Sequence, residues 1–334
     1  MLETCYNKMK TFIEVCAGAG GLSSGFIKAG WKPLLLNDVD KNCCETLRQN
    51  HPHVDVECGG MEELKLEPFV GKVDLLMGGV PCQSFSQAGQ RKGLEDKRGQ
   101  LIYTFMDMIQ KIQPKCFLVE NVKGLVSHDQ GNTLHHILQK LKEMGKYQVV
   151  YKVLNASNYD VPQKRERLFI IGYMNSFTKQ YEFPQTSEKV HVLKDVLTNV
   201  PQSPCASYPQ YKKELFKKIP QGGCWVNLSE EEQRSYLGKS YESGGGKRGI
   251  LHRLHMEKSC LTLLCTPTQK QTERCHPLEE RPLSIREYAR IQTFDDTYVF
   301  HGSMASQYRQ IGNAVPVNLA KHVALSLTKF LSSL

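Results

Sequence analysis

The sequence has few of the features that would place a protein in a membrane or outside the cell. No apolar run in its 334 residues approaches the length of a membrane span, and residues 1–8 lack the apolar core of a signal peptide. It also has no CxxC pair and no visible internal repeat. These absences argue against a repeat architecture and predict a cytoplasmic protein with no membrane partner.

Cysteine is common, yet nothing in its placement predicts disulfides. The twelve cysteines are scattered and include the adjacent pair Cys43-Cys44, so we expect reduced thiols. The residues that could in principle hold zinc are Cys260, Cys265, Cys275 and His276. Their spacing matches no standard zinc site, and we therefore expect no metal.

The charge balance favours a polyanionic partner. Hydrophobic residues make up 40% of the chain and charged residues 23%, as in ordinary globular proteins, and the formal net charge is +9. A net charge of this sign favours association with a polyanion such as nucleic acid. The length allows one large domain or two unequal ones.

A glycine-rich turn follows the first predicted strand. Residues 10–16 form a short apolar run, residues 17–21 predict a turn, and a helical pattern continues to Gly30. Such a turn lets a ligand approach the backbone and offers free N–H groups. The dinucleotide fingerprint would need a third glycine where Ser23 stands, which argues against the alternative of a nicotinamide-dependent oxidoreductase.

A carboxylate follows the second predicted strand, residues 33–36. Asp38 lies 20 residues after Gly18, the spacing expected when an acidic residue binds the ribose of a nucleoside ligand. The structural alternative for a carboxylate here is a helix N-cap, a role that also suits Asp40. A short third strand is predicted at residues 54–57.

A cysteine stands where the fourth predicted strand ends. Residues 72–77 are an apolar run that Gly78-Gly79 stop, and Pro81-Cys82 follow, ahead of the polar, basic residues 87–100. Open α/β sheets carry their chemistry at such strand ends. A thiol packed under a turn is the alternative, but the rigid proline and the two hydroxyl side chains that follow favour an active site.

The next predicted elements bring further polar residues to strand ends. We predict helices at residues 99–112 and 132–144, and strands at residues 116–119, 147–154 and 167–173. Glu120 follows the fifth strand and would point into the same cleft as Cys82. Arg165 and Arg167 lie two residues apart on an extended segment, so they should point the same way and suit an anion or a base edge.

The alternation of strands and helices stops near residue 175, and residues 175–281 predict a second, smaller, irregular unit. From Lys239 to Arg274 there are seven Lys or Arg against three Asp or Glu. This balance favours contacts with phosphates and base edges, although a generic polar loop region is an equal alternative. A helix is predicted at residues 284–293, and residues 312–320 lead into a final helix that should pack on the first domain.

Six sequence blocks, taken in order, resemble those of the DNA cytosine-5 methyltransferases of the bacterial type II restriction–modification type. The blocks are residues 17–21, Pro81-Cys82-Gln83, Glu120-Asn121-Val122, residues 163–167, residues 281–294 and Gly312-Asn313. Residues 90–99 also resemble the catalytic loop of that family. The resemblance covers nearly the whole chain except about residues 175–255.

This resemblance implies an α/β fold of the Rossmann-like, S-adenosylmethionine-dependent methyltransferase type, with a mixed, mostly parallel sheet and helices on both faces. It implies a catalytic and cofactor-binding domain at residues 1–180 plus 311–334, a smaller irregular target-recognition domain at 181–281 and a hinge segment at 282–310. The implied reaction moves a methyl group from S-adenosylmethionine to C5 of a flipped-out cytosine in a short specific DNA sequence, through a covalent adduct of Cys82 with C6. The alternative is a tRNA cytosine-5 methyltransferase of the same family.

The resemblance also implies residue roles. The implied catalytic residues are Cys82 as nucleophile, Glu120 at the base edge, and Arg165 and Arg167, which hold the site and the base. The implied cofactor-binding residues are Cys16, Gly18, Gly20, Gly21, Asp38, Val39, Met61, Pro81, Leu101 and Asn313. The implied DNA-binding residues are Ser86, Arg91, Lys92, Arg98 and Thr262, and the mechanism needs no metal.

Two positions depart from the family pattern. The family usually has an aromatic residue at the place of Cys16, and an aspartate near Gly60 that reads the adenine amine. We therefore expect Val39, Met61 and backbone groups to hold the adenine.

The implied partner is double-stranded DNA. A cognate restriction endonuclease would act on the same site without a stable complex, and we expect a monomer that works in the bacterial nucleoid. A catalytically dead DNA-binding regulator is a further alternative. The retained Cys82, Glu120, Arg165 and Arg167 argue against it.

Overall fold

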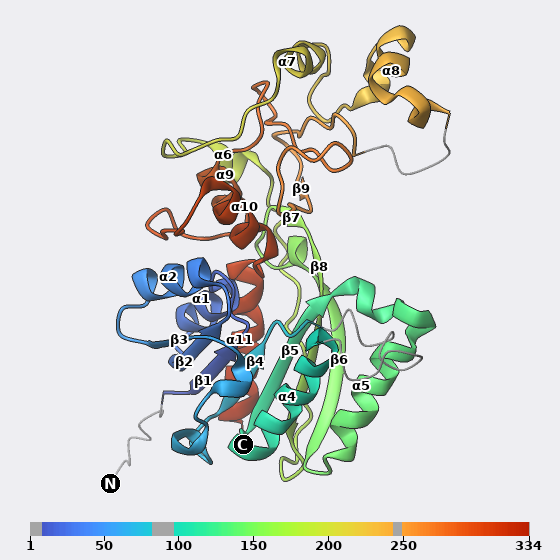
Figure 1. The fold of residues 1–334 in the computed structure, drawn as a ribbon. Coiled ribbons are helices and arrows are strands. Elements are labelled where there is room, and N and C mark those ends of the chain that lie inside the picture. The colour runs from blue at the N-terminus through green and yellow to red at the C-terminus, as the bar shows by residue number, and fades with distance from the viewer. Residues whose placement is uncertain (1–8, 82–96, 243–248, 334) are drawn as a thin grey trace. The chain divides into compact units, whose positions relative to one another are not determined.

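The computed structural model describes residues 9–81, 97–242 and 249–333, drawn as a coloured ribbon in Figure 1. The chain divides into two compact units. The sheet unit comprises Met1–Asn155, Glu166–Thr186 and Val317–Leu334, and the second unit comprises Ala156–Arg165 and Ser187–Pro316.

In the described part of the sheet unit, seven strands form one sheet in the order β3-β2-β1-β4-β5-β8-β6. The strands are β1 (Thr11–Val15), β2 (Lys32–Asp38), β3 (Asp55–Cys58), β4 (Leu75–Gly78), β5 (Cys116–Val122), β6 (Tyr147–Asn155) and β8 (Glu166–Met174). The pairs among β1 to β5 are parallel, whereas β8 runs antiparallel to both of its neighbours. The expected mixed, mostly parallel sheet is confirmed.

Helices cover both faces of this sheet (Figure 1). The helices of the unit are α1 (Gly21–Lys28), α2 (Lys41–Asn50), α4 (Lys97–Ile112), α5 (Asn132–Glu143) and α11 (Val317–Ser332). On one face, Ile102 and Phe105 of α4 and Ile137 of α5 pack with Ile13 and Phe117 of the strands in one buried apolar cluster. The apolar stripe predicted for residues 99–112 therefore serves the core, as expected.

The other face is closed by α1 and α11. Phe26 of α1 packs against Phe12 of β1 with the rings tilted by 56° and their centres 5.8 Å apart. The ring centres of Phe330 of α11 and Tyr173 of β8 lie 5.0 Å apart. The two helices cross so closely that a Cβ on Gly25 would lie 2.4 Å from the Cβ of Ala320. The last helix thus packs on the sheet unit, as the sequence predicts.

The second unit is mostly irregular but contains more helix than the sequence led us to expect. Its helices are α6 (Lys194–Leu197), α7 (Gln210–Lys217), α8 (Glu230–Leu237), α9 (Ile285–Ile291) and α10 (Met304–Asn313). A short parallel pair joins β7 (Gln163–Lys164) to β9 (Cys260–Leu261). A small buried cluster around Phe216, Leu251 and Cys275 forms a core of its own.

None of the helices in the described residues is both long and apolar enough to cross a membrane.

Candidate active site and cofactor pocket

The carboxyl ends of β4 and β5 meet at one edge of the sheet. Gly78 pairs with Val119 in the parallel register, so Gly79 and Glu120 follow side by side. A Cβ on Gly79 would lie 3.3 Å from Oε2 of Glu120, which leaves little room for any side chain at residue 79. Pro81 is the last described residue of this segment, and Cys82 lies outside the described residues.

The side chain of Asn121 ties the two strand ends together. Its Nδ2 donates a hydrogen bond of 2.8 Å to the carbonyl oxygen of Val80, and both atoms are buried. This bond holds the backbone that leads to Cys82. The sequence alone predicts no separate role for Asn121, because a hydrogen bond from a side chain to a distant backbone carbonyl does not affect the spacing of residue types.

Arg167 pairs with Glu120. Its Nε lies 2.9 Å from Oε1 of Glu120, and each side chain is only 11% exposed. The antiparallel register sets Val122 opposite Arg167, which brings the arginine from β8 to the end of β5. Glu120 and Arg167, the predicted catalytic residues of the sheet unit that the structure describes, are therefore in direct contact. Such a pair is charge-assisted and shielded from water, which fixes both side chains.

Arg165 has different partners. It lies in the second unit, is 1% exposed, and donates from Nη1 to the carbonyl of Leu263 (3.0 Å) and from Nη2 to the carbonyls of Gly312 (2.7 Å) and Asn313 (3.3 Å). The sequence predicts that Arg165 and Arg167 face one ligand, but in the structure each binds groups of its own unit. The Arg165 guanidinium thus joins the carbonyl of Leu263 to the last two carbonyls of α10.

The glycine turn after β1 uses the left-handed backbone region three times. Cys16 has φ 51°, Gly18 has φ 56° and Gly20 has φ 74°. Only glycine adopts this region without cost, so Cys16 is strained there by about 1 kcal/mol. The turn leads directly into α1, and the amide of Ser23 in the first turn of that helix hydrogen-bonds to the carboxyl of Glu14.

Asp38 joins the end of β2 to the glycine turn. Its Oδ2 accepts from the Gly18 amide at 2.8 Å and its Oδ1 accepts from the Asp40 amide at 2.8 Å. Burial raises the pKa of Asp38, and these two amides oppose that rise. Asp40 itself caps α2 by accepting from the Asn42 amide at 2.8 Å, as the structural alternative predicts.

Glu14 is a buried carboxyl that sequence reasoning missed. It lies in the middle of β1, is 1% exposed, and burial raises its pKa to about 8, while hydrogen bonds with Ser23 of α1 oppose the rise. The charges of Asp38 and Glu120 raise the pKa further. The signal was present: residue 14 is a lone acidic residue in an apolar strand.

The remaining predicted cofactor residues differ in exposure. Val39 is 72% exposed, whereas Met61 is 2% exposed and belongs to the short 3-10 helix η1 (Met61–Glu63). Leu101 of α4 and Cys16 pack against the sheet core as half-buried residues. Asn313 ends α10 in the second unit, where its Oδ1 accepts from the thiol of Cys265 at 2.9 Å.

Most predicted DNA contacts fall on residues whose structure is not described. Ser86, Arg91 and Lys92 lie outside the described residues, and Arg98 lies in the first turn of α4. Thr262 is described: its hydroxyl donates to the carbonyl of Lys164 at 2.7 Å. That bond joins the segment after β9 to the segment before Arg165.

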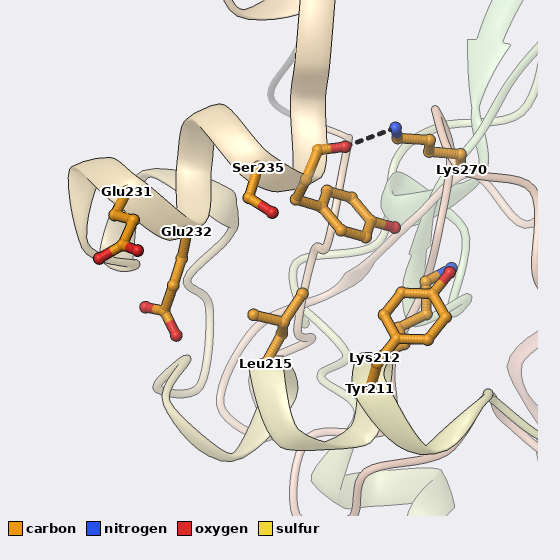
Figure 2. Close-up of a pocket in the computed structure, with 8 residues that line it drawn as sticks. Tyr211, Lys212, Leu215, Glu231, Glu232, Ser235 and Lys270 are labelled. Atoms are coloured by element: carbon orange, nitrogen blue, oxygen red, sulfur yellow. Dashed lines mark hydrogen bonds between the residues drawn. The ribbon is translucent and has the colours of Figure 1, made fainter.

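The second unit has a pocket of its own between α7 and α8, with a volume of about 580 Å³ (Figure 2). Its lining residues are Tyr211, Lys212, Leu215, Glu231, Glu232, Ser235, Tyr236 and Lys270. Lys270 donates to the carbonyl of Tyr236 at 2.7 Å and lies 4.6 Å from the centre of that ring. No predicted catalytic or cofactor residue lines this pocket, and we assign it no part in the chemistry.

The possible zinc ligands do not assemble. No group of three or more His, Cys, Asp or Glu side chains in the described ranges could hold a metal ion, and those ranges include Cys260, Cys265, Cys275 and His276. Instead Cys275 donates to the carbonyl of Glu279, and His276 lies 3.6 Å from Glu287.

Solved structures of other proteins share the fold of this chain. A DNA modification methyltransferase from an E. coli prophage superposes with a TM-score of 0.73 at 24% identity, covering 97% of this chain and 99% of that one. The Entamoeba histolytica methyltransferase EhMeth gives a TM-score of 0.70 at 15% identity over 97% and 99% of the two chains. The expected Rossmann-like methyltransferase fold is confirmed.

Sequence comparison then gives the family. The family model of the C-5 cytosine-specific DNA methylases matches residues 10–329. The type II methyltransferase M.Sau96I of Staphylococcus aureus is 48% identical over 98% of this chain and 77% of its own length. M.Eco47II of Escherichia coli is 45% identical over 98% and 81%. The chain belongs to the C-5 cytosine-specific DNA methylase family and is a DNA (cytosine-5-)-methyltransferase.

Proposed function

We propose that the enzyme methylates a flipped-out cytosine within a short specific sequence of double-stranded DNA, as the modification enzyme of a type II restriction–modification system. The observation that carries this proposal is the Glu120–Arg167 ion pair, which lies at the strand end beside the segment leading to Cys82. A carboxyl and a guanidinium held together suit the polar edge of a pyrimidine. The type II methyltransferases among its relatives support the biological role.

Cys82 is the proposed nucleophile. C5 of cytosine reacts poorly with electrophiles, and turning the base out of the duplex costs roughly a few kcal/mol. Addition of the Cys82 thiolate to C6 raises the electron density at C5, so that C5 can take the methyl group. Loss of the C5 proton then restores the ring and expels the thiolate.

Glu120 and Arg167 would act on the opposite edge of the base. Glu120 holds or donates a proton at N3, so that negative charge does not build up on the ring as the adduct forms. Nε of Arg167 lies 2.9 Å from Oε1 of Glu120, and its Nη1 donates to the Glu166 carbonyl. A guanidinium carries five N–H donors, and the proposed role of Arg167 is to donate from one of them to the O2 oxygen of the base.

Arg165 is a positioning residue in this scheme. Its hydrogen bonds to Leu263, Gly312 and Asn313 hold the segment after β9 and the end of α10. It would act on the reaction by fixing the segment that leads to Arg167.

The residues around the glycine turn fit a nucleoside cofactor. The turn leads into the N-terminus of α1, Asp38 is a carboxylate at a strand end, and the exposed side chain of Val39 offers apolar surface for a base. S-adenosylmethionine, when bound, supplies an electrophilic methyl group on a sulfonium. The proposed pocket residues are Cys16, Gly18, Gly20, Gly21, Asp38, Val39, Met61, Pro81, Leu101 and Asn313.

We assign residues 181–281 to target recognition, residues 1–180 plus 311–334 to catalysis and cofactor binding, and residues 282–310 to a hinge. Ser86, Arg91, Lys92, Arg98 and Thr262 are the proposed DNA contacts. We propose that the enzyme acts as a monomer on nucleoid DNA, and that a restriction endonuclease recognises the same site without a stable complex.

A duplex with 5-fluorocytosine at the target tests the mechanism. Fluorine cannot leave as a proton does, so the wild-type enzyme with S-adenosylmethionine should stay bonded to the DNA through Cys82. Bisulfite sequencing of DNA from a host that expresses the protein first identifies the target sequence. Absence of an adduct on that verified target would contradict the covalent mechanism.

The tRNA alternative is tested by substrate competition. Equal concentrations of plasmid DNA and tRNA, with a labelled methyl donor, should give label only in the DNA. Label mainly in the tRNA would overturn the assignment of substrate.

A further inference from the structure

Two thiols flank one peptide group at the carboxyl end of β2. The Sγ of Cys44, in the first turns of α2, donates to the carbonyl oxygen of Asp38 at 3.2 Å. Cys58, the last residue of β3, is the register partner of Asp38, and the Gly59 amide donates to the same carbonyl at 3.0 Å. Partners in a parallel register direct their side chains to the same face of the sheet. The thiols of Cys44 and Cys58 lie within hydrogen-bond reach of each other, although they are 14 residues apart in sequence.

The environment of the pair suits thiol chemistry. Both thiols are free in the structure; Cys44 is buried and Cys58 is exposed. Burial, followed by a hydrogen bond with Cys58, raises the pKa of Cys44 to about 12. The guanidinium of Arg48 lies close enough to attract both sulfurs as thiolates, and its Nη2 donates to the carbonyl of Val56 at 2.9 Å.

We propose that Cys44 and Cys58 form a disulfide when a hydroperoxide oxidises the protein, and that this disulfide weakens binding of S-adenosylmethionine at Asp38. The second half of this inference rests on the proposed role of Asp38 in the cofactor pocket. The first half needs only the two thiols and the oxidant.

The oxidation proceeds in two steps. The exposed Cys58 sulfur attacks the peroxide bond, which gives a sulfenic acid at Cys58 and releases the alcohol or water of the hydroperoxide. The Cys44 sulfur then attacks the Cys58 sulfur, the S–S bond forms, and the hydroxyl leaves as water with the Cys44 proton. The two thiols together lose two electrons, which the peroxide bond gains. Because the buried Cys44 holds its proton tightly, the second step should be slow at neutral pH and faster as the pH rises.

Disulfide formation would act on Asp38 in two ways. It removes the S–H group that now donates to the Asp38 carbonyl. It also draws two hydrogen-bonded sulfurs to a bond length of about 2.05 Å, which moves the first turns of α2 or the end of β3. The carboxylate of the same residue holds the Gly18 and Asp40 amides, so a shift of Asp38 reaches the glycine turn.

The test uses the full chain with Cys82→Ser, which removes the proposed nucleophile as a competing target of oxidation. After treatment with tert-butyl hydroperoxide, mass spectrometry with peptide fragmentation should find a Cys44–Cys58 link and should exclude Cys43 as the partner. Titration calorimetry should show that the Kd for S-adenosylmethionine rises about tenfold or more, and that dithiothreitol restores it. Adding Cys58→Ser should abolish both effects, whereas the matched control Cys224→Ser, a half-buried thiol of the second unit, should abolish neither.

The proposal fails if no Cys44–Cys58 link forms, or if the link forms and the Kd changes less than about twofold. A reduced protein that does not bind S-adenosylmethionine at all, yet forms the link, would instead contradict the proposed cofactor pocket, and with it the coupling to Asp38. The peptide mapping and the binding titration thus separate the two failures.

Discussion

The backbone groups of the two units find their hydrogen-bond partners in different ways. In the sheet unit, all of β4 pairs with β5 and all of β6 pairs with β8, and the cluster around Phe105 and Phe117 is apolar. In the second unit, buried arginine side chains form hydrogen bonds with backbone carbonyls. Arg165 joins three carbonyls, and Arg253 donates to the carbonyl of Phe216 at 2.6 Å and to Glu280 at 3.0 Å.

This difference explains why arginine has a proposed catalytic role in one unit and a structural role in the other. Where the sheet satisfies the backbone, polar side chains at strand ends, such as Arg167 and Glu120, remain for chemistry. Where loops predominate, an arginine such as Arg165 is needed to satisfy buried carbonyls. Substitutions in the first region should therefore lower the rate, and those in the second should lower stability.

The largest effect should come from Cys82→Ala. Without the nucleophile, methyl transfer to verified target DNA should fall by about three orders of magnitude or more, because C5 is no longer activated. A radiolabelled-methyl assay measures this, and thermal unfolding should be unchanged. Cys224→Ala, in the second unit, is the control and should retain activity. A Cys82→Ala protein that still methylates the DNA would contradict the assignment of chemistry to the sheet unit.

Glu120→Gln should lower the single-turnover rate by about 10² to 10⁴-fold, because an amide cannot supply a proton at N3. DNA affinity should change by less than about threefold. The control is Glu166→Gln, which removes an exposed ion pair with Lys123 of 2.8 Å and should leave the rate unchanged. Equal losses of rate and DNA affinity in Glu120→Gln would mean that Glu120 binds rather than catalyses.

The sheet unit was largely predictable because its signals are local. Short apolar runs stopped by glycine mark β1 and β4, although β4 begins only at Leu75 and not at Lys72. The order of the motifs then indicated the family. The Asn121–Val80 bond and the carbonyl partners of Arg165 could not be foreseen, because a backbone carbonyl is the same at every residue.

The helices of the second unit were missed for another reason. A polar composition suggested loops, yet α8 begins with a capping box in which Ser229 and Glu232 bond each other's backbone amides. That Ser-x-x-Glu pattern is visible in the sequence and could have predicted the helix. α7 begins at Gln210, and Pro209 before it supplies no side-chain cap, so we attribute this helix to its packing through Phe216 in the small core.

Arg165→Ala and Arg167→Ala compare the two regions directly. Arg165→Ala should lower the free energy of unfolding by about 3 kcal/mol, because it leaves buried carbonyls of Leu263 and Gly312 unsatisfied. Arg165→Lys should recover little, since an ammonium cannot span both carbonyls. Arg167→Ala should instead reduce the methylation rate more than the stability. Urea unfolding measures the stability of each variant, and the methyl assay measures its rate. A larger loss of rate in Arg165→Ala and a larger loss of stability in Arg167→Ala would contradict the roles assigned to the two arginines.

Glu14→Gln tests the more deeply buried of the two acids, Glu14 and Glu120, that are buried in the described strands of the sheet. The Glu14 pKa is raised to about 8 from an ordinary 4.5, so between these values the folded state binds the proton that the unfolded state has lost. Wild-type stability should therefore fall as pH rises through this window, by at most about 1.4 kcal/mol per pH unit. Glu14→Gln should show a flatter curve in urea unfolding. Parallel curves for the two proteins would show that Glu14 is not protonated in the fold.

The smallest expected effect, from Gly79→Ala, tests how closely the two strand ends must approach. The new Cβ would lie 3.3 Å from Oε2 of Glu120, so the carboxylate must move by a few tenths of an ångström. A displaced acid should slow methyl transfer by about tenfold, while the free energy of unfolding changes by less than about 1 kcal/mol. Gly124→Ala is the matched control, since its nearest neighbour would lie 4.0 Å away. If both variants keep the wild-type rate, the close approach of the end of β4 to Glu120 does not limit the chemistry. A small displacement of the Glu120 carboxylate would then leave methyl transfer unaffected.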